Sequence, residues 1–324
     1  MSCRVRGPPN GYPAIRDRLI VLRMRNGAVG AVTMLACVLI TGCAVSGARP
    51  ATLSAPEPEA PRVVLAARER AAVPRPAPQQ SAVLPVIADD ASSLTEQLVT
   101  AERAVRDPAV TGEQLAYMGH LQQLVYRRLI ERPELRDPVF AMIPQDVRAA
   151  ADLNFAASAD LWLFGTVYTT VLPAWHIVPP APLDDLLSYY HEAEAEFGVP
   201  WSYLAAINLV ETRMGRIRGA SYAGAQGPMQ FMPATWDAYG RGDINDPHDA
   251  ILAAGRYLSA AGAPAKMERA IWAYNHDDEY VDAVQKYAAV MQADPSAFRG
   301  YYAWQVYFIT ANGVVLLPVG YTKD

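Results

Sequence analysis

Two short stretches decide the fold of this chain: INLVET at residues 207–212 and GAQGPMQ at residues 224–230. The first is an apolar run that ends in an acid, Glu211. Helical spacing puts the residues three, four and seven positions earlier on the same face as this acid, namely Asn208, Ile207 and Leu204. Pro200 precedes the run where a first helical turn tolerates proline. The pattern predicts a mostly apolar helix that carries one carboxyl group near its end.

Two effects would raise the pKa of Glu211. One is partial burial, and the other is the negative end of the helix dipole, because Gly215 is a plausible helix stop one turn further on. A carboxylic acid that stays protonated near neutral pH can protonate the leaving oxygen of a glycosidic bond. The helix alone leaves a second interpretation open, in which Glu211 is a solvated acid at the rim of the core.

The N-terminal part of the chain differs in composition from the rest. An apolar run, Gly27–Ile40, follows Arg23 and Arg25. It is short for a membrane-spanning helix but has the length of the apolar region of a signal peptide. The run leads into ITGC at residues 40–43, which resembles the bacterial lipobox, whose cysteine is acylated and becomes the new N-terminus.

We therefore expect a lipoprotein signal peptide over residues 1–42, with Met24 as an alternative start, and lipidation at Cys43. Acylation with two or more chains would anchor the protein stably to a membrane. The expected location is extracytoplasmic, in the cell envelope, with the lipid in a bacterial membrane. An ordinary secretory peptide or an uncleaved anchor are the alternatives.

Cysteine content and charge limit which bonds and partners the protein is expected to have. The chain has only Cys3, Cys37 and Cys43, and none lies beyond the cysteine expected to be lipidated, so the mature domain has no cysteine left for a disulfide. Residues 1–42 hold six arginines and one aspartate, so their removal changes the formal charge from −5 to about −10. This argues against nucleic acid as a partner. The five histidines show no metal-ligand spacing, and we expect neither a metal nor a cofactor.

Composition divides the remainder into four parts. Proline and alanine enrich the start of the mature chain, which predicts an extended tether over residues 43–91. Capping-box patterns at Ser93–Glu96 and Thr111–Gln114 predict a helical region over residues 92–171. Its apolar stripe indicates packing against other helices, and the sequence does not indicate its role or its protein partners.

The catalytic candidate domain is predicted over residues 172–300. Further helices are expected near residues 234–239, 248–260, 266–275 and 278–291. Asp246 precedes Pro247 and reads as a helix cap. Asn312-Gly313 lies between β-favouring runs and predicts a hairpin within residues 301–324. The expected fold class is therefore mainly α with a short C-terminal β-hairpin.

Four separated blocks then match one family in order: Glu211-Thr212, residues 221–236, Asp246-Pro247 with Ala250-Ile251, and Ala273-Tyr274-Asn275. They resemble the lytic transglycosylases of the soluble (SLT), goose-type-lysozyme-like group, over about residues 183–291. The resemblance implies a lysozyme-like helical catalytic domain. Three positions depart from the usual pattern: Thr212 where many relatives have serine, Pro228 where leucine is common, and His276 where glycine is common.

The resemblance also implies roles for particular residues. Glu211 would be the catalytic residue, and the substrate-binding residues would be Ser221, Gly227, Met229, Gln230, Thr235, Tyr274 and Asn275. Physical chemistry is compatible with this set. Glycine allows close backbone approach to a sugar, Gln230 offers a donor and an acceptor, and Met229 can line an apolar floor. The Tyr274 hydroxyl is expected to reach the acid. Core, cap and turn roles are the alternatives for Met229, Thr235 and Asn275.

The activity implied is cleavage of the bond between N-acetylmuramic acid and N-acetylglucosamine in peptidoglycan, with formation of a 1,6-anhydro product. Glu211 would serve as a single acid and base, without a second carboxylate. The expected partners are glycan strands and, through Cys43, the membrane, and the protein is expected to act as a monomer. Two alternatives stay open: a hydrolytic muramidase on the same fold, and a non-catalytic glycan-binding lipoprotein.

Overall fold

The computed structural model describes residues 83–164 and 169–323, all within one unit of the chain, Glu69–Asp324. The expected signal peptide, Cys43 and most of the expected tether lie outside these residues. None of the helices in the described ranges combines the length and the hydropathy needed to cross a bilayer.

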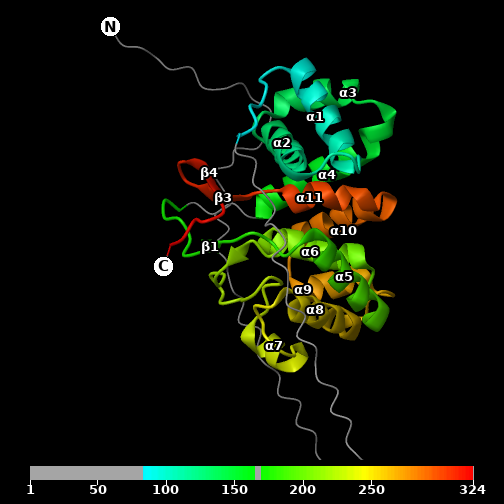
Figure 1. The fold of residues 1–324 in the computed structure, drawn as a ribbon, viewed down its shortest axis with the longest axis vertical. Coiled ribbons are helices and arrows are strands. Elements are labelled where there is room, and N and C mark those ends of the chain that lie inside the picture. The colour runs from blue at the N-terminus through cyan, green and yellow to red at the C-terminus, as the bar shows by residue number, and fades with distance from the viewer. Residues whose placement is uncertain (1–82, 165–168, 324) are drawn as a thin grey trace, which may run out of the picture. The chain divides into compact units, whose positions relative to one another are not determined.

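Four α-helices and a short 3-10 helix form the first described segment (Figure 1): α1 Ala91–Arg106, α2 Gly112–Glu131, η1 Pro133–Leu135, α3 Arg136–Met142 and α4 Gln145–Phe164. The helical region predicted here is confirmed, but its caps differ from the expected pattern. Asp90 caps α1 by accepting a hydrogen bond from the Ser93 backbone N–H at 2.9 Å. Thr111 stands at the N-cap of α2 without a side-chain capping bond.

The second described segment is also mainly helical. Its helices are α5 Leu183–Phe197, α6 Trp201–Thr212, α7 Pro233–Tyr239, α8 Pro247–Ala261, α9 Met267–Tyr274, α10 Asp278–Ala293, η2 Pro295–Ala297 and α11 Phe298–Ala303. The helices predicted near residues 234–239, 248–260, 266–275 and 278–291 correspond to α7, α8, α9 and α10, with ends that differ by at most two residues. The mainly α prediction is therefore confirmed.

Two small antiparallel sheets complete the fold. The predicted C-terminal hairpin is confirmed as β3 Val306–Thr310 and β4 Gly313–Leu317, in register from Val306 opposite Leu317 to Thr310 opposite Gly313. β1 His176–Ile177 pairs with β2 Ile217–Arg218. Ile177 and the inward-facing hairpin residues form a small apolar cluster of their own, Ile177, Val306, Phe308 and Leu317.

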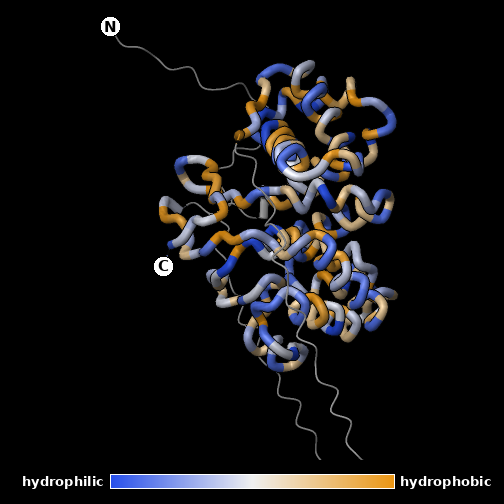
Figure 2. The backbone as a smooth tube through the Cα atoms, viewed as in Figure 1, coloured by the Kyte–Doolittle hydropathy of each residue, from blue (hydrophilic) through white to orange (hydrophobic). Residues whose placement is uncertain are grey.

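The main core surrounds α6. Five apolar residues of this helix are completely buried, namely Leu204, Ala205, Ala206, Ile207 and Leu209. A helix that is apolar nearly all round requires neighbours on every side. Helix α10 packs against both α6 and α4, and Figure 2 shows the hydrophobic residues distributed along these helices. The helices before residue 165 and those after residue 168 thus share one core. Glu211 lies next to the end of α6 and is only half-buried.

Candidate active site

Helix α6 ends immediately after Glu211. Its last residue is Thr212, and Arg213 and Met214 then take left-handed backbone conformations with φ of 53° and 62°. The backbone N–H of Arg213 donates to the Leu209 carbonyl at 3.2 Å. The expected stop at Gly215 is therefore wrong, because the helix is closed by a non-glycine residue in a conformation that usually favours glycine.

Glu211 is half-buried and accepts one hydrogen bond. Its Oε1 atom lies 2.7 Å from the Tyr280 hydroxyl, which donates to it. Burial raises the pKa of Glu211 from 4.5 to about 7, and the bond from Tyr280 acts in the opposite direction. The pKa thus moves in the direction expected from the sequence, with burial as the main cause. The carboxyl group is poised to release and recover a proton near neutral pH.

The sequence pointed to a different tyrosine. Tyr274 was expected to reach Glu211, but its hydroxyl donates to the backbone carbonyl of Met229 at 2.6 Å. Burial raises the pKa of Tyr274, and the charge of Glu211 acts in the same direction. Tyr280 was not anticipated from the sequence. Helical spacing could have revealed it, since it opens the buried stripe of α10 formed by Tyr280, Val284, Tyr287 and Met291.

The glycine-rich loop has the unusual backbone that its sequence predicts. Gly227 has φ of 74°, and a Cβ atom there would lie 1.9 Å from the Ile244 carbonyl oxygen. Gly224 has φ of 87° and faces open space. Gln226 and Phe231 exchange two backbone hydrogen bonds of 2.9 and 2.8 Å that close the loop. The loop therefore has a specific backbone conformation that its glycines and these two hydrogen bonds maintain.

Two side chains of α6 hold this loop in place. The Pro228 carbonyl accepts hydrogen bonds from Asn208 Nδ2 at 2.8 Å and from Thr212 Oγ1 at 2.5 Å. Asn208 is itself fixed by the Tyr190 hydroxyl, which donates to its Oδ1 at 2.6 Å. The hydroxyl of Thr212 does here what a serine at this position could also do. Asn208 entered the sequence argument only as a residue on the face of Glu211.

The predicted substrate-binding residues of the loop have contacts within the loop. Ser221 Oγ accepts from the Ala225 backbone N–H at 3.0 Å. Gln230 has φ of 51° and donates its amide to the Gly227 carbonyl at 2.9 Å. The Met229 side chain is completely buried, so the expected apolar floor is not offered to a substrate in this structure. Their role in binding stays a prediction.

Thr235 and Asn275 both lie at helix ends. The backbone N–H of Thr235, in the first turn of α7, donates to the Met232 carbonyl at 2.9 Å. Asn275 is the C-cap of α9 and donates its backbone N–H to the Ile271 carbonyl at 3.1 Å. Each is half-buried. These positions match the cap and turn alternatives, and substrate contacts from their side chains stay a prediction.

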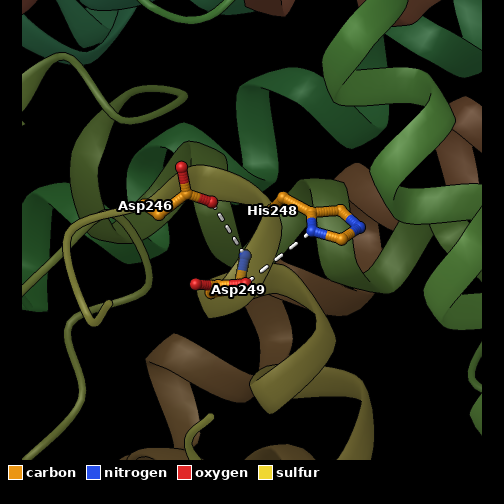
Figure 3. Close-up of side chains that lie close together, drawn as sticks. All are labelled: Asp246, His248 and Asp249. Atoms are coloured by element: carbon orange, nitrogen blue, oxygen red, sulfur yellow. Dashed lines mark hydrogen bonds and ion pairs between the residues drawn. The ribbon is translucent and has the colours of Figure 1, made fainter. Parts of the chain in front are cut away.

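The carboxylates of Asp246 and Asp249, which follow the loop, accept hydrogen bonds from nearby backbone N–H groups (Figure 3). Asp246 is the N-cap of α8, as predicted, and its Oδ1 accepts from the Asp249 backbone N–H at 3.0 Å. Asp249 Oδ2 accepts in turn from the Asp243 backbone N–H at 2.9 Å. Potential metal-ligating atoms of Asp246, His248 and Asp249 lie within 4.8 Å of one another. Helix capping accounts for this cluster, and we assign no metal to it.

Comparison with known proteins places the site in a family. Residues 188–294 match the family model of the transglycosylase SLT domain. The membrane-bound lytic murein transglycosylase F of Thiobacillus denitrificans is 26% identical over 152 residues. This match covers 44% of the present chain and 32% of the relative, so the chain spans about a third of that protein.

Two solved structures have a weaker likeness. One is a 36 kDa muramidase/transglycosylase with 15% identity and a TM-score of 0.31, covering 62% of this chain and 94% of that one. The other is the Escherichia coli lytic transglycosylase SLT35 in complex with calcium, with 16% identity and a TM-score of 0.30, covering 62% and 93%. The family model covers Glu211, the glycine-rich loop, Tyr274 and Tyr280, and the chain therefore carries a transglycosylase SLT domain at residues 188–294.

Proposed function

We propose that this protein is a peptidoglycan lytic transglycosylase that cleaves the MurNAc-β-1,4-GlcNAc bond with Glu211 as its single acid and base. The SLT domain supports an enzyme acting on peptidoglycan. The observation that carries the assignment of the acid is the half-buried Glu211 carboxyl group, whose pKa burial raises to about 7. At that pKa both protonation states are accessible near neutral pH.

The reaction needs two proton transfers, one from the Glu211 carboxyl group and one back to it. Protonated Glu211 donates to the glycosidic oxygen as the C1–O bond breaks, and N-acetylglucosamine leaves. The resulting carboxylate takes the proton from the C6 hydroxyl of the muramic acid, whose oxygen attacks C1 and closes the 1,6-anhydro ring. Tyr280 keeps its hydrogen bond to the carboxyl group throughout and stabilises the carboxylate between the two steps.

A rigid support lets one carboxyl group perform both steps. Asn208 and Thr212 fix the loop to α6 through the Pro228 carbonyl, and Tyr274 fixes it to α9 through the Met229 carbonyl. These bonds hold the loop beside the helix end that carries Glu211. Orientation of this kind contributes a large part of catalysis because the reacting groups need not be ordered at each turnover.

Digestion of purified cell-wall sacculi tests the proposal. Mass analysis of the released muropeptides should find 1,6-anhydro ends, and Glu211→Gln should lower their release by about 10²–10⁴-fold while glycan binding survives. Reducing ends would identify a hydrolytic muramidase instead. Glycan binding by the wild-type protein without any release of muropeptides would identify a binding protein. Full activity of Glu211→Gln would contradict the assignment of Glu211 as the acid.

We also propose that the protein is anchored in the cell envelope through lipidated Cys43. The support is the sequence ITGC at residues 40–43 behind an apolar run, together with a relative that is described as membrane-bound. Cys43→Ala should move the protein from the membrane fraction to a non-sedimenting form and abolish labelling by a radioactive fatty acid. Labelling that persists in this variant would contradict the proposal.

A further inference from the structure

Helix α9 carries a large aromatic side chain on its exposed face. Trp272 is 44% exposed, and among the tryptophans of the described residues it alone is exposed. The opposite face of α9 packs in the core through Ala270 and Ile271, which are completely buried. Helical spacing puts Trp272 beside Glu268 and Arg269 on the solvent face. Tryptophan is highly buried on average, so Trp272 departs from the polar pattern of this face and from the usual burial of its residue type.

Trp272 forms one wall of a pocket that is lined from both α9 and α10, and we name it the α9–α10 pocket. Its volume is about 540 Å³, which lies in the range of roughly 300–1,000 Å³ of small-ligand sites. Its walls include Lys266, Glu268, Arg269 and Trp272 from the α9 side and Asp278 and Val281 on α10. Val281 is buried and adds apolar surface to the lining. The pocket therefore combines an aromatic side chain with charged groups of both signs.

His276 packs against the indole of Trp272. The centroids of the two rings are 4.3 Å apart, and the ring planes meet at 73°, which is an edge-to-face arrangement. In such an arrangement the imidazole covers at most one face of the indole, and the exposure of Trp272 agrees with a free face. His276 is also one of the three positions at which the chain departs from the usual pattern of its relatives. The ring pair is thus a feature of this chain.

The charged side chains of the pocket balance one another. Lys266 and Arg269 are cationic, and Glu268 and Asp278 are anionic. All four are exposed, and in the part of the chain that the structure describes none of them forms an ion pair. The cationic groups donate hydrogen bonds and the carboxylates accept them. This lining suits an uncharged ligand whose groups both donate and accept, whereas a carboxylate-rich peptide would need an excess of cationic side chains.

An N-acetylhexosamine has the chemistry that this lining would recognise. The face of an aromatic ring carries negative partial charge and attracts positively polarised C–H groups. A pyranose ring presents such C–H groups on its flat face, with hydroxyl and acetamido groups around its edge. A sugar stacked on Trp272 would therefore direct its hydrogen-bonding groups toward the charged side chains of the pocket.

The position of the pocket relative to Glu211 limits which sugars of a strand it can take. Asp278 and Val281 are three residues apart and share one face of α10. Tyr280 lies between them in sequence, points to another face, and donates its hydroxyl to Glu211. An α-helix with its side chains is about 10 Å across. The pocket is thus near the acid but separate from it, and it can hold a part of the strand other than the disaccharide being cut.

We propose that the α9–α10 pocket is a second glycan-binding site, where Trp272 stacks on N-acetylhexosamine units of the strand outside the bond being cut. This inference rests on the proposed function, because a glycan strand reaches the pocket as the substrate of the SLT domain. Binding at two places on one polymer raises its apparent affinity, since the second contact forms within the same complex. Short fragments that occupy only the site at Glu211 gain nothing from the pocket.

Binding without cleavage tests the site. In a Glu211→Gln background, Trp272→Ala should weaken binding to glycan strands freed of their stems by an amidase by about fivefold, the loss of one aromatic contact. Isothermal titration calorimetry measures this affinity. Trp272→Phe keeps a ring and should lose less than Trp272→Leu, which keeps only apolar surface. Met142→Ala is the matched control, because Met142 is 46% exposed on α3, and it should change nothing.

Turnover of substrates of two lengths tests the place of the site. In otherwise wild-type protein, Trp272→Ala should raise KM on long strands by about fivefold and leave kcat unchanged. On the shortest oligosaccharide that the enzyme cuts, both constants should equal those of the wild-type protein. An equal rise in KM on both substrates would put Trp272 at the bond being cut and would overturn the proposal of a second site.

Three further outcomes would overturn the proposal. Unchanged strand binding by a Trp272→Ala protein with the wild-type unfolding temperature would remove the site. Equal binding by Trp272→Leu and Trp272→Phe would show that the ring does not stack on a sugar. A loss confined to strands that keep their stems would make the ligand a peptide.

Two more comparisons keep the test decisive. If Trp272→Ala does not fold, Arg269→Ala on the same exposed face takes its place and should weaken strand binding by about threefold. A wild-type protein that leaves sacculi uncut would refute the proposed function. The effect of Trp272→Ala on strand binding would still decide whether the pocket binds glycan.

Discussion

At the scale of single residues, the hydrogen bond from Tyr280 to Glu211 limits how far burial raises the pKa of the acid. The hydroxyl favours the carboxylate, so its loss in Tyr280→Phe should raise the pKa of Glu211 further. The alkaline limb of the pH–rate profile, where the acid form disappears, should then move to higher pH. Turnover at neutral pH should fall about tenfold, since a positioning hydrogen bond is lost. The measurement is release of anhydromuropeptides between pH 5 and 9, and an unmoved alkaline limb would contradict this role of Tyr280.

Glu211 should also make stability depend on pH. Its folded-state pKa of about 7 lies above the ordinary 4.5, so the stability that the buried neutral acid contributes is fully present below about pH 4.5 and is lost as the pH rises through about 7. The amide in Glu211→Gln does not ionise. The unfolding temperature of this variant should therefore exceed that of the wild-type protein by more at pH 8 than at pH 5. A difference that is the same at both values would mean that the carboxyl group is not desolvated.

At the scale of elements, the conformation of the glycine-rich loop requires a residue without a side chain at position 227. A Cβ at position 227 would lie 1.9 Å from the backbone oxygen of Ile244, which cannot move aside as a side chain could. Gly227→Ala should cost about 3 kcal/mol or more in chemical unfolding and should lower turnover with it. Gly224→Ala is the matched control, because it has a similar φ but open space around the added atom, and should cost about 1 kcal/mol. Equal losses in the two variants would show that the contact with Ile244 does not matter.

The same elements show which features of the site could be predicted from sequence patterns and which could not. Spacing along one helix predicted α6 and the partial burial of Glu211, because helical periodicity is local. It did not select the tyrosine that meets the acid, since Tyr274 and Tyr280 lie on neighbouring helices and only the packing of α9 and α10 on α6 decides between them. The cap at Asp246 was predictable from its own turn. The left-handed stop at Arg213 was not, because it contradicts the backbone preference of a non-glycine residue.

At the scale of the whole molecule, the helices before residue 165 and the SLT domain depend on one another. Helix α4 packs along α10, with Lys286 Nζ 2.6 Å from Asp160 Oδ2 and the Ser158 and Tyr287 hydroxyls 3.0 Å apart. Buried residues of α1, α2 and α4 belong to the same apolar core as those of α6 and α10. The SLT domain therefore lacks a complete core of its own, although its sequence reads as a separate unit.

Truncation should reveal this dependence. A chain of residues 172–324 would expose the face of α10 that α4 now covers, and with it the helix that supplies Tyr280 to Glu211. We expect this chain to lose cooperative thermal unfolding, measured by near-ultraviolet circular dichroism, and to lose muropeptide release. Residues 83–324 should instead unfold in a single transition. If the shorter chain melts cooperatively near the same temperature and remains active, the helices before residue 165 do not complete the core.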